Sequence, residues 1–299
     1  MMTRVYFLCA ALTALAVSFS ARAEFTATLG AGFEYDSNVE VEAAETNAGL
    51  GDTGRTLDVE LGLKQRLSGH WQMSGAYLFN DTRWQRYSTY NTQLHTGMLQ
   101  LRGSHGALTT ELTGVYAAAY LTEQDFLQLR RISPALGWMP DRHWYLRSQL
   151  DAGRKTFNDY SGRDSDSLGL RLQFFRFFNR SAFYLTGGGQ WKQETADDPQ
   201  YSYRAGIGRL ALKRDWTLAG HELSSRLFLR VEHREYLSTW TDLDAARNDW
   251  RLRAGLSNRL MLGAGWSLAL KLQNDDFRSN LSAADYSQYR VDAGVQWQF

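Results

Sequence analysis

Apolar and polar residues alternate with a period of two along most of the chain. The clearest case is residues 55–67, where aliphatic residues alternate with charged residues and glycine: Leu57, Val59, Leu61 and Leu63 against Asp58, Glu60, Gly62, Lys64 and Arg66. Because successive side chains of a strand point to opposite faces, this pattern predicts strands with one apolar and one polar face. Fourteen such strands are predicted, near residues 24–39, 55–67, 71–83, 93–102, 107–120, 126–138, 143–155, 165–178, 181–194, 201–214, 226–234, 250–259, 266–275 and 286–299.

Short and long connections alternate between these predicted strands. The short ones are rich in turn residues and lie near residues 68–70, 103–106, 140–142, 179–181, 217–221 and 263–265. The long polar ones lie near residues 40–54, 84–92, 121–125, 156–164, 195–200, 236–246 and 277–285. Short turns at one end and longer loops at the other are typical of outer-membrane barrels. In the strand at 126–138, Pro134 predicts a bulge, because proline cannot donate to a neighbouring strand.

The segment 286–299 alternates to the last residue of the sequence. Residues 292–299 look like the signal that ends bacterial outer-membrane barrels, with a glycine two places after a polar residue and aromatic residues at the sixth and eighth places. That resemblance implies contact with the barrel assembly machinery through Gly294, Trp297 and Phe299. Tryptophans that flank predicted short turns are expected to form an interfacial belt: Trp71, Trp138, Trp144 and Trp266. A soluble two-sheet sandwich could also contain many strands, but it explains neither of these features.

The first 23 residues read as a secretory signal peptide. Arg4 supplies the positive charge, residues 5–18 form a short apolar run, and Ala21, Arg22 and Ala23 give a small-x-small cleavage site. The apolar run is shorter than the roughly 20 residues of a spanning helix. We therefore expect a signal peptide at 1–23 and a mature chain at 24–299, which would contain no cysteine because Cys9 lies in the signal.

Composition agrees with a membrane barrel. Mean hydropathy is low, at -0.43, although aromatic residues make up 13% of the chain. Half-apolar strands produce such values. The 33 basic and 32 acidic residues nearly cancel, which gives no basic field for a nucleic acid. Because an open sheet edge in lipid would leave backbone groups unsatisfied, the strands are expected to close. The sequence predicts an all-β fold: one antiparallel up-and-down barrel of about 14 strands.

The polar face of the predicted strands carries many basic residues. Charges that face lipid at the membrane midplane cost roughly 2 to 4 kcal/mol each for Arg or Lys, so these are expected to line the lumen. The candidate pore-lining residues of the carboxyl-terminal half are Arg226, Arg230, Arg234, Arg251, Arg253, Arg259, Lys271 and Arg290. They could form a basic stripe in a water-filled passage that favours anionic or sugar-like solutes. Alternatively, they could pair with carboxylates and only brace the wall.

Other chemistry is weakly represented. The acids of the first loop could hold Ca²⁺ or could simply be solvated: Asp36, Glu40, Glu42, Glu45 and Asp52. His233 and Glu232 are adjacent in a strand and would point to opposite faces, so they would not form a catalytic pair. No nucleophile elbow, metal-spaced histidine cluster or phosphate-binding glycine loop occurs in the sequence. We expect no catalytic residue, no cofactor site and no metal site.

Residues 29–39 carry a family resemblance. Their sequence, LGAGFEYDSNV, is similar to the entry strand of barrels related to the carboxyl-terminal domain of surface lipoprotein assembly modifiers, and to that of some exopolysaccharide-associated barrels. The resemblance implies a 14-stranded outer-membrane transport barrel. The assembly modifiers usually carry an amino-terminal domain of helical repeats, whereas here the barrel is expected to follow the signal directly. Client capture that depends on that domain is therefore not implied.

These observations favour an integral protein of the bacterial outer membrane that acts as a channel or translocator. Its expected partners are outer-membrane lipid and lipopolysaccharide, the barrel assembly machinery, and an anionic or sugar-like solute or an exported cargo. The alternatives are a surface lipoprotein export factor or an exopolysaccharide-associated export barrel. An outer-membrane enzyme or a structural surface protein are further alternatives.

Overall fold

A computed structural model describes residues 23–41, 46–241 and 243–299. The signal-peptide interpretation falls almost entirely on residues 1–22, which lie outside the described residues. The strands are β1 (Ala23–Asp36), β2 (Glu40–Val41), β3 (Thr46–Asn47), β4 (Asp52–Arg66), β5 (Trp71–Trp84), β6 (Thr92–His105), β7 (Leu108–Leu121), β8 (Gln124–Asp141), β9 (Trp144–Phe157), β10 (Ser165–Asn179), β11 (Phe183–Ala196), β12 (Tyr203–Leu218), β13 (His221–Trp240), β14 (Ala245–Gly263), β15 (Trp266–Ser279) and β16 (Tyr286–Gln298). Four short 3-10 helices lie in loops: η1 (Ser88–Tyr90), η2 (Ser161–Arg163), η3 (Pro199–Tyr201) and η4 (Ser282–Ala284).

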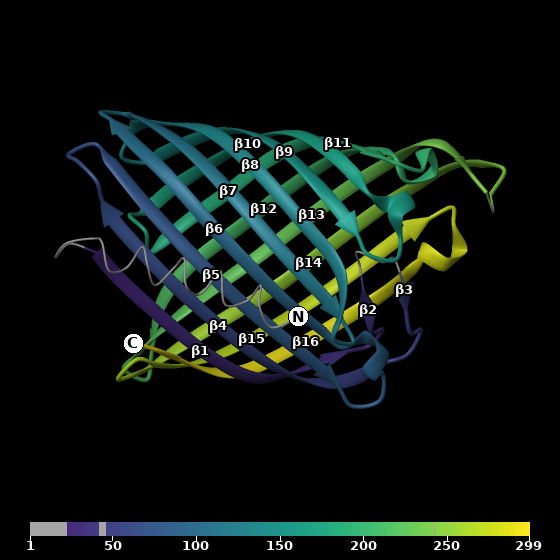
Figure 1. The fold of residues 1–299 in the computed structure, drawn as a ribbon. Coiled ribbons are helices and arrows are strands. Elements are labelled where there is room, and N and C mark those ends of the chain that lie inside the picture. Colours follow the sequence, from purple (N-terminus) through teal and green to yellow (C-terminus); the bar gives the residue numbers. More distant parts are fainter. Residues whose placement is uncertain (1–22, 42–45, 242) are drawn as a thin grey trace.

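Fourteen of the strands form one closed antiparallel barrel (Figure 1). Each strand pairs with its neighbour in the sequence, and β1 closes the barrel by pairing with both β4 and β16. The two remaining strands, β2 and β3, form a separate hairpin in the first loop. The prediction of a 14-stranded up-and-down barrel is confirmed. No helix among the described residues is long and apolar enough to cross a membrane.

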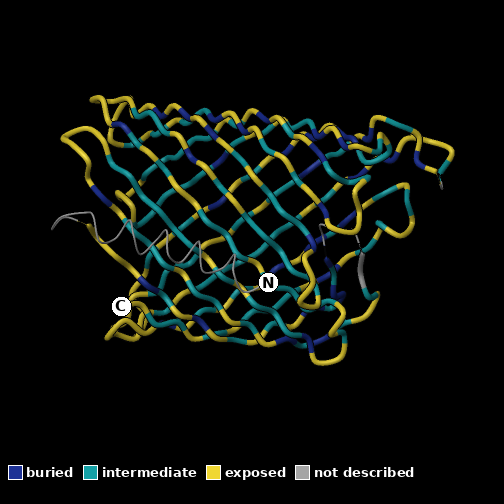
Figure 2. Tube along the Cα trace, viewed as in Figure 1, coloured by how far each residue is buried: buried dark blue, intermediate teal, exposed yellow. Residues whose placement is uncertain are grey.

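The apolar face of the strands points outward and the polar face points inward. Aliphatic side chains on neighbouring strands lie side by side on the outside, as in the row of Leu256 on β14, Leu272 on β15 and Val291 on β16. Large hydrophobic residues are accordingly exposed in every barrel strand, and exposed and partly buried positions alternate along each one (Figure 2). In a soluble protein such a surface would be unstable, but in lipid it is the required arrangement.

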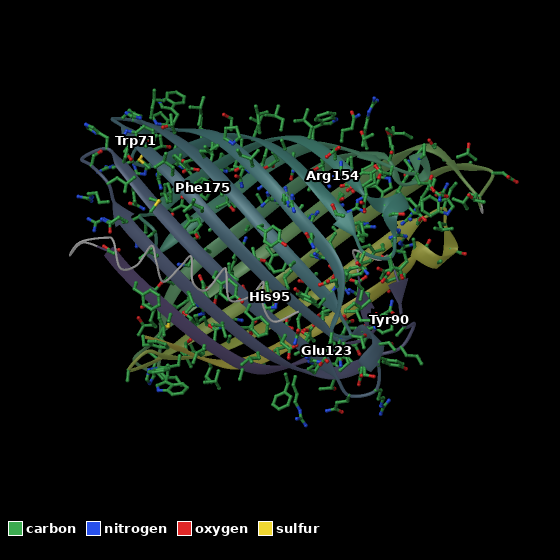
Figure 3. The ribbon with its side chains drawn as sticks, in the orientation of Figure 1. Trp71, Tyr90, His95, Glu123, Arg154 and Phe175 are labelled. Carbon is green, nitrogen blue, oxygen red and sulfur yellow. The ribbon has the colours of Figure 1, made fainter. Side chains whose placement is uncertain are left out.

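The four turn-flanking tryptophans lie on this outward face near the short-turn end. All four are exposed: Trp71, Trp138, Trp144 and Trp266. Figure 3 shows Trp71 at one end of the barrel and Tyr90 and Glu123 at the other. Because tryptophan prefers the boundary between hydrocarbon and water, this belt of four tryptophans marks one edge of the apolar band.

The short turns are where the sequence predicts them, but two of the long connections are shorter than expected. Between β7 and β8 only Thr122 and Glu123 form the turn, both with positive φ (50° and 68°), as a tight hairpin turn requires. The predicted loop at 236–246 is largely strand, because β13 continues to Trp240 and β14 begins at Ala245. Tyr236 and Trp240 of this extension pack in a buried apolar cluster with Tyr203 of β12.

The bulge predicted at Pro134 is also wrong. Pro134 pairs with Leu112 of β7, and the register of β8 against β9 is the same at Ile132 and at Ala135. The irregularities of β8 fall elsewhere, on the β7 side near Phe126 and on the β9 side between Trp138 and Asp141. The missing N–H of proline therefore removes ladder bonds to β9 without shifting the strand.

Phe299 joins the two ends of the barrel wall. Its backbone exchanges hydrogen bonds of 3.0 and 3.1 Å with Ala27 of β1, and its ring lies 4.5 Å from that of Trp297. The Trp297 ring in turn lies 6.0 Å from that of Trp266. Contact of Gly294, Trp297 and Phe299 with the assembly machinery stays a prediction.

We expect Phe299→Ser to lower the yield of folded barrel in membranes several-fold, because it removes both the aromatic end of the β16 signal and its packing on Trp297. The measurement is the fraction of protein in the outer-membrane fraction that migrates as a compact species without heating. The matched control is Phe25→Ser, an exposed outward aromatic on β1. Equal assembly of the two variants would contradict a signal role for the terminal aromatic residue.

Candidate functional site: the barrel lumen

All eight basic residues predicted to line a pore lie on the inward face. Arg226, Arg230 and Arg234 alternate along β13 with outward residues, and β14 to β16 carry the rest in the same phase: Arg251, Arg253, Arg259, Lys271 and Arg290. Their surroundings decide between the two interpretations of this set. Six of them have carboxylate partners, and two do not.

The first braced group lies at the loop end of β15 and β16. Arg290 contacts three carboxylates, with Nη2 to Glu40 at 2.6 Å, Nε to Asp36 at 3.1 Å and Nη2 to Asp275 at 3.5 Å. Arg253 Nε lies 2.5 Å from Asp275 Oδ1 on the neighbouring strand. Because these carboxylates are buried, the pairs fix the wall more than they attract solutes.

A second braced group occupies the inner wall from β9 to β13. Glu194 accepts from Lys155, from Lys192 at 2.5 Å and from the Tyr203 hydroxyl at 2.9 Å. Farther round the wall, Glu232 binds both Arg230 and Arg234. The sequence predicted the basic members of this group on β13, and their partner Glu232 lies on the same strand, two residues from each.

Arg247 was not singled out from the sequence, although it is the most deeply buried cation described. Its side chain is 1% exposed, and it makes two 2.9 Å bonds to Asp249. The guanidinium also lies over the rings of Tyr236 (4.7 Å) and Trp240 (5.0 Å). The only sequence signal was its phase with Asp249, which places both on the inward face of β14.

A polar cavity of about 820 Å³ lies inside the barrel. Its lining includes the basic residues Lys213, Arg226, Arg259, Lys271 and Arg290 and the acids Glu34, Asp58, Glu222 and Asp292. Lys271 lies 3.4 Å from Asp292, and Lys213 lies 3.0 Å from Asp215. Among the described residues, no carboxylate forms an ion pair with Arg226 or Arg259. These two arginines are therefore available to a solute.

A row of three arginines crosses the inner wall beside this cavity. Arg209 of β12 is the register partner of Arg230, and Arg230 is the register partner of Arg253 of β14. Like charges placed directly opposite destabilise a sheet unless something offsets them. Glu232 and Asp275 offset two of the three, whereas Arg209 donates to the neutral oxygen of Gln190 at 2.9 Å and forms no ion pair with a carboxylate of the described residues. The row therefore retains positive charge.

An aromatic row, which the sequence analysis did not identify, runs along the inner wall near the short turns. Successive ring centroids are 5.6 Å apart from Tyr145 to Phe175, 6.4 Å from Phe175 to Phe177 and 5.9 Å from Phe177 to Tyr184. Lys213 lies 5.8 Å from the Tyr184 ring. Residues 174–178 are aromatic on both faces, so period-two alternation does not distinguish them.

The outer mouth is crossed by β2. Glu40 is held at β16, where it accepts from Tyr286, from Gln288 at 2.7 Å and from Arg290. Its neighbour Val41 packs with Phe126 of β8 and Phe157 of β9. In the strand order β9 is the seventh strand from β16 in both directions, which is the opposite wall. Figure 1 shows β2 and β3 at the loop end of the barrel.

The first-loop acids are engaged by protein groups. Asp36 and Glu40 bind Arg290, and Asp52 accepts from the backbone of Thr53, Arg86 and Tyr87. The candidates Glu42 and Glu45 lie outside the described residues. Within the described part of the chain, no group of three or more His, Cys, Asp or Glu side chains is placed to hold a metal ion.

His233 and Glu232 point to opposite sides of the wall, as their spacing predicts. His233 stacks outside on Trp250 at 4.3 Å, while Glu232 faces inward to Arg230 and Arg234. This pair therefore provides no acid-base arrangement.

Several solved outer-membrane proteins have a similar architecture. An anion-selective porin from Comamonas acidovorans aligns with a TM-score of 0.52 and 11% identity, covering 93% of this chain and 99% of that one. Acinetobacter baumannii OccAB3 aligns at 0.49 and 8%, covering 93% and 99%. The translocator domain of the autotransporter NalP from Neisseria meningitidis aligns at 0.37 and 12%, covering 99% and 96%. No family model and no curated protein matches the sequence.

These findings define the class of fold. The chain is a closed 14-stranded β-barrel of the outer-membrane type, with an apolar outer face, a charged lumen and a crossed outer mouth.

Proposed function

We propose that this protein is a channel of the bacterial outer membrane that passes anionic or sugar-like solutes. The observation that carries the proposal is the inner cavity, where no carboxylate of the described residues pairs with Arg226 or Arg259, beside the positive row that includes Arg209. A guanidinium that faces the lumen attracts anions and donates hydrogen bonds to them. The proposal rests on these charges and not on the selectivity of the porin that shares the fold.

The aromatic row supports the sugar-like part of the proposal. Tyr145, Phe175, Phe177 and Tyr184 lie on the inward side of the wall, and Lys213 lies beside the last of them. Ligand sites commonly combine aromatic faces with a few polar groups. A ring-shaped solute with a carboxylate or phosphate could stack on the aromatic row and bind the neighbouring basic residues at the same time.

The first test is the ion selectivity of the purified mature chain in planar bilayers. We expect the zero-current potential in a KCl gradient to show preference for chloride, and the double variant Arg226→Gln, Arg259→Gln to reduce that preference several-fold. Both substitutions remove charge without breaking an ion pair in the described residues. The control is Arg204→Gln on the outward face of β12, which should leave selectivity unchanged. Preference for potassium in the unsubstituted protein would contradict the proposal.

An export role is the second candidate, and the crossed mouth favours it. Residues 29–39, which resemble the entry strand of surface lipoprotein assembly modifiers and of exopolysaccharide-associated barrels, form most of β1 and lead into β2. A barrel whose mouth is closed until a partner binds would conduct no current in the bilayer test. If current is absent in the unsubstituted protein and present when β2 is released, export of a lipoprotein or polysaccharide cargo is favoured over passive diffusion.

A further inference from the structure

A groove of about 710 Å³ lies on the outward face of the wall, across β5 to β8. Its floor contains one glycine on each of three neighbouring strands: Gly75, Gly97 and Gly114. A Cβ at Gly114 would meet no atom within 4 Å, and at Gly75 and Gly97 the nearest atoms would be 3.8 and 3.9 Å away. Space rather than backbone strain is therefore what these glycines provide. Larger apolar residues form the walls: Leu63, Met73, Leu99 and Ile132.

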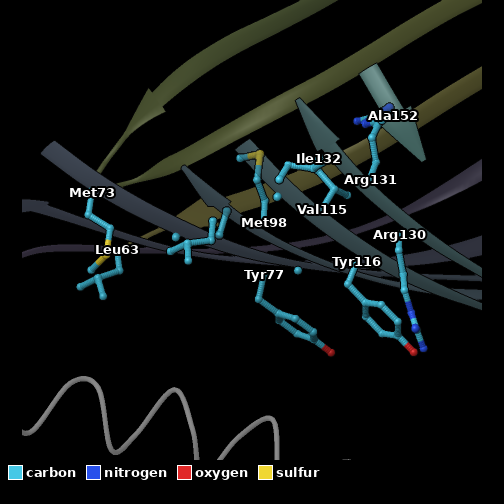
Figure 4. Close-up of a pocket in the computed structure, with 15 residues that line it drawn as sticks. Leu63, Met73, Tyr77, Met98, Val115, Tyr116, Arg130, Arg131, Ile132 and Ala152 are labelled. Carbon is cyan, nitrogen blue, oxygen red and sulfur yellow. The ribbon is translucent and has the colours of Figure 1, made fainter. Parts of the chain in front are cut away.

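One side of the groove is polar. Tyr77, Tyr116 and Arg130 lie in one register row with Gly97 and extend to the same side in Figure 4. Among the described residues, no carboxylate pairs with Arg130. Its register partner Arg154 is paired instead, at 3.0 Å from Asp166. The groove thus combines an apolar floor with an outward guanidinium for which the described residues provide no counter-charge.

Arg130 lies near the outer edge of the apolar band. It is eight residues from Trp138, which belongs to the belt at the short-turn end. With a rise of about 3.3 Å per residue and a tilt of about 45°, the two are separated by roughly 19 Å along the barrel axis, within a band about 25 Å tall. An arginine at that height reaches the polar boundary of the outer leaflet.

We propose that this groove binds the lipid A part of lipopolysaccharide, with an acyl chain over Gly75, Gly97 and Gly114 and a phosphate on Arg130. The assignment rests on the outer-membrane location given under Proposed function. A guanidinium matches phosphate in charge and in bidentate geometry, and in the described part of the chain no carboxylate pairs with Arg130. The polar side faces the loop end, and that end meets the leaflet that contains lipopolysaccharide.

The test is native mass spectrometry of the delipidated full-length mature protein with lipid A or phosphatidylglycerol added. We expect one lipid A per chain, and Arg130→Gln should weaken its binding about tenfold, as loss of a charge-assisted hydrogen bond does. Gly97→Leu with Gly114→Leu should abolish it by filling the groove. The matched controls are Arg204→Gln and Gly206→Leu on the outward face of β12, where a Cβ at Gly206 also meets nothing within 4 Å.

Each contrary outcome overturns the assignment. Equal binding of phosphatidylglycerol would exclude lipid A as the preferred occupant, and a change in oligomer mass in the glycine variants would make a second copy the occupant. Indifference to Arg130→Gln would remove the phosphate contact. The channel proposal is tested separately, because currents in phosphatidylcholine bilayers should be the same for Arg130→Gln and the unsubstituted protein.

Discussion

Replacing Glu40 with alanine and Val41 with serine is expected to raise the single-channel conductance several-fold. These two residues attach β2 to opposite walls of the outer mouth, through Arg290 on one side and Phe126 with Phe157 on the other. Releasing both contacts detaches β2 from the two walls and leaves it paired with β3. Ion flow, which depends on the narrowest point, should increase accordingly.

The barrel wall should tolerate this double substitution. Without Glu40, Arg290 keeps Asp36 at 3.1 Å and Asp275 at 3.5 Å, so its charge is not left buried without a partner. Loss of the Val41 side chain from its cluster costs about 1.5 to 3 kcal/mol of apolar burial, which acts on the position of β2 and not on the sheet. The variant should therefore remain a folded barrel.

Conductance and polymer exclusion measure the effect. Larger polyethylene glycols should enter the variant than enter the unsubstituted pore. Glu123→Ala is the matched control, since Glu123 is an exposed acid at the same end whose 3.0 Å contact is with Arg83 on the outside of the wall. Identical currents in all three proteins would show that β2 does not restrict the passage.

The strands could be predicted from the sequence because the environment imposes a simple rule. Lipid outside and water inside require alternation on every strand, and Leu57 to Leu63 follow that rule on β4. The rule does not extend beyond the apolar band. Residues Thr122–Glu123 are polar, and polar and apolar residues are mixed near Trp240, so composition does not separate a turn or a strand extension from a loop.

The contacts of the lumen were less accessible to prediction than its charge. Alternation places Arg290 on the inner face, but its partner Glu40 is 250 residues away and reaches it only through closure of the barrel. Val41 likewise meets Phe126 only because β2 crosses the mouth. Arg253 is paired with a carboxylate, whereas Arg226 faces the cavity without an ion pair among the described residues. Which of these two situations a basic residue has depends on such three-dimensional pairing.

Gly294→Val is expected to prevent stable closure of the barrel. Gly294 of β16 is the register partner of Gly32 of β1, at the seam where the two ends of the sheet meet. A Cβ at Gly294 would lie 2.8 Å from the carbonyl oxygen of Ala31 and 3.3 Å from the Cα of Gly32. These are backbone atoms of the facing strand and cannot rotate away.

The cost should exceed that of ordinary overpacking, which is about 1 to 3 kcal/mol. Moving β1 away from β16 breaks seam hydrogen bonds, and in lipid each unsatisfied backbone group costs several kcal/mol. We expect unheated Gly294→Val to migrate as an unfolded chain and to resist refolding into vesicles. Gly206→Val is the control, because a Cβ there meets nothing within 4 Å. If both variants refold with the same urea midpoint, the space between β1 and β16 accommodates a side chain at position 294. Closure of the barrel would then not depend on Gly294.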